Sequence, residues 1–150
     1  MKKIFVVMLS LILGALSYVF FNSTKENINN CSSRFAIFSS NVKIESNISF
    51  VFFEHDGVLT LSGIFHDHGN SLPIYRQIHF KYKLSKGFLI LESLKIKRLN
   101  GDLIVSDFDS IPLPEFYLKE GSEITFDISK NNAGTLFSRG KVPLFYCWYD

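Results

Sequence analysis

From Val42 onward, apolar side chains alternate with polar ones along segments that are separated by turn signals. The first such segment spans residues 42–52, and its alternate positions hold Val42, Ile44, Ile48, Phe50 and Phe52. A period of two places these side chains on one face of a β-strand, whereas an amphipathic helix would repeat about every 3.6 residues. The chain is therefore expected to bury its apolar side chains as a β-sheet with one covered face.

Short turn signals separate the expected strands. Asp56-Gly57 predicts a two-residue hairpin turn, which would set Phe52 opposite Leu61. Ser85-Lys86-Gly87 predicts a three-residue turn, and Asn100-Gly101 a type I′ turn into a strand over residues 102–108. The prolines of the segment 109–122 indicate a long connection instead. The pattern predicts seven or eight strands.

Consecutive hairpins build an up-and-down antiparallel sheet. With about 120 residues and one apolar face, such a sheet is best buried by curling into a small barrel around a core or one ligand. The predicted fold class is thus all-β, with a small up-and-down antiparallel barrel that follows one N-terminal transmembrane helix. A two-layer sandwich is the alternative.

The N-terminus carries a separate signal, an uncharged run of eighteen residues from Ile4 to Phe21. That length approaches what a membrane-spanning helix needs. A cleaved signal peptide is the alternative, because residues 15–17 resemble a cleavage site, but the apolar run continues beyond them. We expect residues 1–21 to be a cytoplasmic stub and anchor, residues 22–30 a polar tether, and residues 31–150 an exported domain. Lys2 and Lys3 place the N-terminus in the cytoplasm.

The chain has two cysteines, Cys31 and Cys147, one near each end of the expected domain. Outside the cytoplasm a single pair of thiols is expected to form a disulfide. In a barrel this bond would join the first and last segments and close the sheet edges. Two buried, unpaired thiols are the alternative.

Basic and acidic residues nearly balance, at sixteen and fourteen, so no basic surface for nucleic acid is expected. Basic residues predominate in 76–98 and acidic ones in 102–127. This asymmetry fits either two oppositely charged outer faces or a surface that docks a partner.

His66 and His68 lie two apart on an expected strand and so share a face. The Asp56-Gly57 register places Glu45 opposite His68, which would bring together three weak candidates for zinc ligands. A His-x-His pair lacks the ligand count of strong zinc motifs. A solvated loop and a pH response of the histidines are the other interpretations. We expect no metal and no cofactor.

A ligand cavity is expected where apolar faces meet inside the barrel, with candidate lining residues Phe50, Phe52, Phe80, Tyr82, Arg76 and Glu92. The face of the sheet on which Glu92 lies depends on the length of the turn that precedes it. A three-residue turn puts it opposite Phe80 on the inner face, where Arg76 could be its partner, and a two-residue turn puts it opposite Lys81 in solvent. Both registers stay open.

No signature of a common enzyme class is present: G-x-S-x-G, H-E-x-x-H and phosphate-binding loops are all missing. A cysteine held in a disulfide is also not a nucleophile. We therefore expect no catalysis.

A Lys-Lys start, one N-terminal span, "NCSS" around Cys31 and "FYCWYD" around Cys147 resemble the FidL-like membrane proteins of enteric-type bacteria. The resemblance implies a lipocalin-like periplasmic barrel on a single-pass inner-membrane anchor. It also implies a sensory or stabilising partner, of the ToxS and VtrC type, that forms a heterodimer with the periplasmic domain of a membrane-anchored winged-helix transcription regulator. A small apolar, bile-salt-like ligand at a shared cavity is implied for some members. The alternative is a stand-alone carrier of a small apolar molecule.

Overall fold

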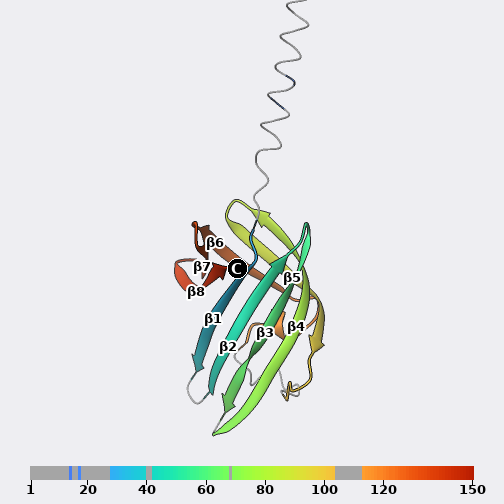
Figure 1. Cartoon of the computed structure of the whole chain (residues 1–150), viewed down its shortest axis with the longest axis vertical. Coiled ribbons are helices and arrows are strands. Elements are labelled where there is room, and N and C mark those ends of the chain that lie inside the picture. The colour runs from blue at the N-terminus through green and yellow to red at the C-terminus, as the bar shows by residue number, and fades with distance from the viewer. Residues whose placement is uncertain (1–13, 15–16, 18–27, 40–41, 68, 104–112) are drawn as a thin grey trace, which may run out of the picture.

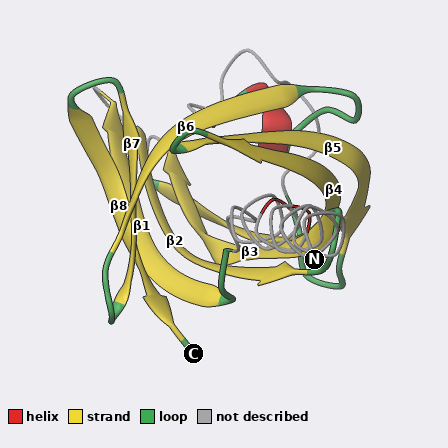
Figure 2. Cartoon of the chain, turned by 90° about the horizontal axis from the view of Figure 1, so that it is seen from above, coloured by secondary structure: helices red, strands yellow, loops and turns green. Residues whose placement is uncertain are grey.

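The computed structural model describes residues 14, 17, 28–39, 42–67, 69–103 and 113–150. Eight strands form a closed antiparallel barrel in which each strand pairs with the next and β1 pairs with β8 (Figures 1 and 2). The elements are β1 (Cys31–Ser39), β2 (Val42–Phe52), β3 (Asp56–Asp67), β4 (Asn70–Ser85), β5 (Phe88–Arg98), the 3-10 helix η2 (Glu115–Tyr117), β6 (Glu123–Lys130), β7 (Gly134–Arg139) and β8 (Val142–Tyr149). The predicted all-β barrel is confirmed, and the sandwich alternative is wrong.

The expected membrane anchor, residues 1–21, lies outside the described part of the chain except for Gly14 and Ser17. Of the expected tether, only residues 28–30 are described. Among the described residues, no helix has the length and apolar character that a membrane crossing requires.

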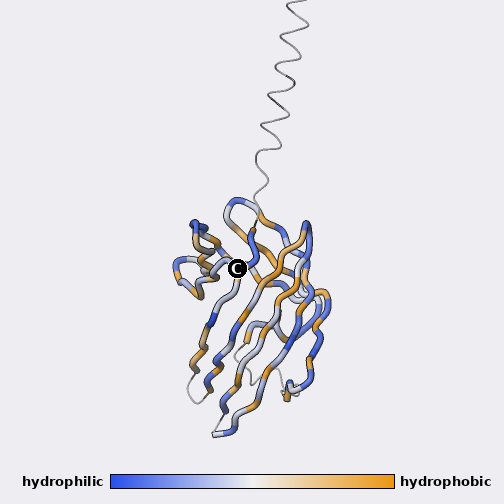
Figure 3. The backbone as a smooth tube through the Cα atoms, viewed as in Figure 1, coloured by the Kyte–Doolittle hydropathy of each residue, from blue (hydrophilic) through white to orange (hydrophobic). Residues whose placement is uncertain are grey.

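The apolar core of the barrel follows the predicted alternation. Along β2, the inward positions Ile44, Ile48 and Phe50 are at most 1% exposed, and polar residues alternate with them on the outside. Figure 3 shows the same alternation of apolar and polar residues along the long strands. Phenylalanine rings fill the middle of the barrel, where Phe50 stacks on Phe137 with ring centroids 5.4 Å apart. The period of two in the sequence therefore identified the covered face of the sheet correctly.

The β2–β3 hairpin differs from the prediction. Its loop consists of residues 53–55, and Phe52 pairs with Gly57 instead of Leu61. Asp56 and Gly57 belong to β3 and pair with β4, so Asp56-Gly57 is not the predicted turn. The register is displaced by four residues, an even number, and the inner and outer faces are therefore the predicted ones.

Gly57 has a packing role instead, because the ring of Phe80 lies over it. A Cβ atom at this position would come within 2.5 Å of Phe80 Cζ and 2.6 Å of the Val51 carbonyl oxygen. We expect Gly57→Ala to lower the free energy of unfolding by about 1–3 kcal/mol, the usual cost of overpacking. Denaturant titration measures the change. Thr60→Ala, a half-buried position farther along β3, serves as the control and should cost less, within about 1 kcal/mol.

The β4–β5 connection decides the position of Glu92. The turn contains two residues, Lys86 and Gly87, whose φ angles of 51° and 82° are those of a type I′ turn. Ser85 then pairs with Phe88, and Glu92 pairs with Lys81. The three-residue turn and the inward Glu92 are therefore wrong, and the solvent register is correct.

A type I′ turn at Asn100-Gly101 is also wrong. Only Gly101 has a positive φ, 102°, whereas a type I′ turn requires positive φ at both central residues. The Asp102 amide donates a hydrogen bond to the Leu99 carbonyl, which closes the turn. Most of the strand expected over 102–108 lies outside the described residues.

Candidate functional site

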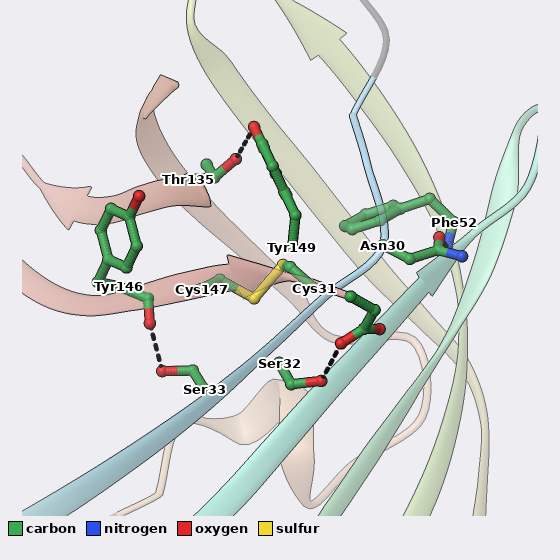
Figure 4. Close-up of a disulfide and its surroundings, with 10 residues drawn as sticks. Asn30, Cys31, Ser32, Ser33, Phe52, Thr135, Tyr146, Cys147 and Tyr149 are labelled. Carbon is green, nitrogen blue, oxygen red and sulfur yellow. Dashed lines mark hydrogen bonds between the residues drawn. A yellow bond between two sulfur atoms is a disulfide. The ribbon is translucent and has the colours of Figure 1, made fainter. Parts of the chain in front are cut away.

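The seam between the first and last strands has the shortest strand pairing in the barrel. β1 and β8 share only two register pairs, Cys31 with Tyr149 and Ser32 with Trp148. The Cys31–Cys147 disulfide lies at this point, with Cα atoms 5.3 Å apart and 116 residues between them in the sequence (Figure 4). Beside it, Ser33 Oγ donates a hydrogen bond of 2.7 Å to the Tyr146 carbonyl. The predicted disulfide and its position at barrel closure are confirmed.

Beyond these two pairs the strands separate, and an apolar pocket of about 360 Å³ opens between them. The inner faces of β1 and β8 contribute Phe35, Ile37 and Phe145, and the barrel interior contributes Leu113, Tyr117 and Phe126. The rings of Phe35 and Phe145 face each other across the gap with centroids 6.2 Å apart. Pro143 on β8 has no N–H to donate, which suits an open strand edge.

The described lining of the pocket is apolar. None of the twelve described residues that line it carries a formal charge. Tyr117 is the residue at its inner end that could ionise, and burial raises the pKa of its phenol far above the usual range, so the group stays neutral. The volume lies within the range of small-molecule sites. The arrangement can therefore hold a small apolar molecule between two strand edges.

Large apolar side chains are exposed at the ends of β1 and β8 that contribute to this pocket. Phe38 at the end of β1 is 71% exposed, and Val142 and Leu144 at the start of β8 are 61% and 45% exposed. Exposed apolar side chains that gather at one place usually mark a binding surface. We call Phe38, Val142, Pro143 and Leu144 the seam rim.

The residues predicted to line a cavity are distributed differently. Phe50 and Phe80 are fully buried, with ring centroids 6.3 Å apart, so this level of the barrel is filled by side chains. Phe52 stacks on Phe50 at 5.7 Å. The Tyr82 hydroxyl donates to the Phe53 carbonyl at 2.7 Å, and burial, followed by the charges of Asp56 and Glu54, raises the pKa of this phenol. None of these four aromatic residues lines the seam pocket.

Arg76 lies inside the barrel as predicted, but its partner is not Glu92. Arg76 Nε and Asp102 Oδ2 are 2.9 Å apart, with both side chains almost completely buried. The Arg76 guanidinium also donates to the Tyr117 carbonyl at 3.2 Å, which fixes η2 against the barrel interior. Glu92 instead pairs with Lys81 on the outer face at 2.8 Å and takes no part in the interior.

The weak zinc candidates do not assemble a ligand set. Glu45 pairs with Ile64 in the register, and its carboxylate is 3.9 Å from His66 Nε2. The hydrogen bond and the charge of Lys43 lower the pKa of Glu45. His68 lies outside the described residues. Within the described ranges, no three His, Cys, Asp or Glu side chains lie close enough together to hold a metal ion.

Two parts of the site were missed at the sequence level. Asp102 was expected in a turn and at the start of a strand. In the structure its carboxylate accepts a hydrogen bond from the Tyr75 amide, and the one sequence sign of such a role was a carboxylate directly after Asn-Gly. Leu113 and Tyr117 were expected in a connection, yet the apolar run "FYL" over residues 116–118 could have indicated a segment that enters the core.

Comparison with known proteins gives one match. The family model of the YqeJ C-terminal domain matches residues 28–147, which include every strand up to the second cysteine of the disulfide. No curated protein and no solved structure matches the chain.

Proposed function

The chain belongs to the YqeJ C-terminal domain family, and we propose that it is a membrane-anchored periplasmic binding module and not an enzyme. In this proposal the barrel receives a small apolar molecule in the seam pocket and acts as a sensory or stabilising partner of a membrane-bound transcription regulator. The supporting observation is the position of the pocket. It lies between β1 and β8, where the two strands are no longer paired.

A ligand at this position would contact β1, β8 and η2 at the same time, because Phe35, Phe145 and Tyr117 all line the pocket. It would bind more tightly to the arrangement in which these elements are correctly spaced. A ligand shifts an equilibrium by its difference in affinity for the two states. The seam rim lies at the ends of β1 and β8 that contribute to this pocket, so a bound partner would respond to the state of the pocket.

The anchor and the partner complete the proposal. The uncharged run from Ile4 to Phe21 supports a single-pass inner-membrane anchor with a periplasmic barrel. The disulfide supports export, because such bonds persist in oxidising compartments. The resemblance to FidL-like proteins supports a heterodimer with the periplasmic domain of a membrane-anchored winged-helix regulator, and the apolar seam rim offers a surface for it.

Ile37→Asp tests the ligand site directly. Ile37 lines the seam pocket, and a carboxylate there would be desolvated by any apolar occupant. We expect the dissociation constant of the full chain for a bile salt, taken as the probe, to rise at least about tenfold. Equilibrium dialysis with a radiolabelled bile salt measures it. Ile64→Asp, an equivalent change at a 45% exposed position on β3, should leave the affinity unchanged.

A bile salt that fails to bind the unmodified chain, or that binds both aspartate variants equally, would contradict the ligand site.

Extraction with a mild detergent tests the partner. Co-purification with a membrane-anchored winged-helix protein, abolished by Leu144→Asp in the seam rim, supports the heterodimer. Isolation of the chain alone with a bound lipid-like molecule supports the stand-alone carrier instead.

A further inference from the structure

The outer face of the barrel carries a second hollow, separate from the seam pocket. It has a volume of about 700 Å³ and lies between the outer faces of β1, β2 and β3 and the last residues of β8. Its floor is formed by outward side chains in two rows that cross three paired strands. One row is Ser32, Ser49 and Thr60, and the other is Arg34, Asn47 and Ser62.

The floor suits a ligand that has many hydroxyl groups. Five of its six side chains are short hydroxyls or an amide, and these groups can both donate and accept hydrogen bonds. Ser49, Thr60 and Ser62 make no side-chain hydrogen bond to any described residue, so their hydroxyls are available to a ligand. Neighbouring strands repeat at about 4.8 Å, which gives the rows a regular spacing.

The charge of the hollow excludes other ligand classes. Among the described residues that line it, only Arg34 and Asp150 are charged, and they have opposite signs. Arg34 Nε already donates to Asn47 Oδ1 at 3.1 Å, and Asp150 Oδ1 accepts from Ser32 Oγ at 2.7 Å. A phosphate-rich ligand would need more positive charge, and a lipid chain would need an apolar floor.

Two aromatic side chains form one wall of the hollow. Trp148 is 59% exposed, and its ring centroid lies 4.4 Å from that of Tyr146 at an interplanar angle of 66°. The Tyr146 hydroxyl donates to Asn131 Oδ1 at 2.7 Å, and Cys147, between the two aromatic residues, is held by the disulfide. The Tyr146 ring is therefore held by its hydroxyl, and the backbone between the two aromatic residues is held by the disulfide. An exposed Trp presents a flat face whose burial is favourable.

We propose that this hollow binds an oligosaccharide. A sugar ring has an apolar C–H face and a polar rim of hydroxyls. The first would stack on Trp148, and the second would meet the rows that contain Ser49, Asn47 and Thr60. The proposal does not depend on the seam pocket, since the two sites have no described lining residue in common.

Trp148 is the only tryptophan of the chain, so its fluorescence reports on the hollow directly. The full chain is titrated, in a detergent without a sugar headgroup, with tetrasaccharides of N-acetylglucosamine and of β-1,4-linked glucose. Emission should shift to shorter wavelength and saturate, with a dissociation constant on the order of 0.1 mM for so open a site. A response to the N-acetylglucosamine oligomer alone would identify an amino-sugar glycan, and an equal response to both would identify a general β-glycan site.

Variants separate the hollow from the rest of the surface. Asn47→Ala keeps the reporter and should weaken binding about five- to tenfold, as expected for the loss of one hydrogen bond. By calorimetry, Trp148→Ala should abolish binding and Trp148→Phe should retain part of it. Phe88→Ala removes an aromatic side chain that is 48% exposed elsewhere and should have no effect.

Three results would overturn the proposal. The first is the absence of any shift up to about 10 mM of either tetrasaccharide. The second is binding, measured by calorimetry, that Asn47→Ala and Trp148→Ala both leave unchanged. The third is a response to extended peptides but to neither saccharide, which would assign the hollow to a protein partner. The bile-salt probe of the seam pocket should not compete, so failure of one site leaves the other test intact.

Discussion

Reduction of the Cys31–Cys147 disulfide is expected to lower the free energy of unfolding by about 4–5 kcal/mol, because the bond closes a loop of more than one hundred residues in the unfolded chain. The double variant Cys31→Ser/Cys147→Ser should show the same loss. Denaturant titration of the oxidised, reduced and double-variant proteins measures it. The effect is large because the loop is long, with 116 residues between the two cysteines in the sequence.

The loss of stability should also be concentrated in particular strands. Without the disulfide, amide hydrogen exchange should rise first in β1 and β8, where the ladder is shortest, and least in β3 and β4, which pair along their whole length. Ser33→Ala serves as the control, since it removes one hydrogen bond at the same seam and should cost about 1 kcal/mol. A reduced protein with unchanged stability and unchanged exchange in β1 would contradict the role assigned to the disulfide.

Removal of one member of the Arg76–Asp102 pair should have a comparable effect. Asp102→Asn removes the negative charge that lies 2.9 Å from the buried Arg76 Nε, and we expect the free energy of unfolding to fall by about 3–5 kcal/mol. Arg76→Met should cost a similar amount, because it also removes the hydrogen bond to the Tyr117 carbonyl. Thermal and denaturant unfolding measure both variants.

The matched control is the pair of Lys81 and Glu92 on the outer face, at 2.8 Å. Glu92→Gln should change stability by less than about 1 kcal/mol, since exposed pairs contribute little. The double variant Arg76→Met/Asp102→Leu should recover part of the loss, because a buried ion pair can be replaced by apolar groups without an uncompensated charge. Equal effects of Asp102→Asn and Glu92→Gln would contradict the role assigned to the buried pair.

The difference between these two pairs shows where sequence reasoning stopped. Alternation alone put Arg76 on the inner face, and the structure agrees. Alternation did not identify the partner of Arg76, because the register between β4 and β5 depends on whether the turn contains two or three residues. The Lys86-Gly87 turn moved Glu92 to the outside, and Asp102, 26 residues beyond Arg76, took its place. A one-residue change in register transfers every side chain to the other face.

The seam pocket was beyond sequence reasoning for a related reason. Its lining comes from both ends of the domain and from the connection that contains Leu113 and Tyr117, which only closure of the barrel brings together. The predicted cavity at Phe50 and Phe80 followed from the same inward pattern, but a pattern of inward residues does not say which of them pack against one another and which leave a space. Side-chain volumes in three dimensions decide that.

The sequence by itself determined the period of two, the β-barrel class, the covered faces of β2, β3, β4 and β6 and, together with the expected export, the disulfide between Cys31 and Cys147. These properties are local or depend on a single possible pairing, so they do not need coordinates. Tertiary structure decided the strand registers, the partner of Arg76, the early separation of β1 from β8 and the two hollows, one in the seam and one on the outer face. Each of these depends on contacts between residues far apart in the chain, where small differences in turn length and side-chain volume select one arrangement.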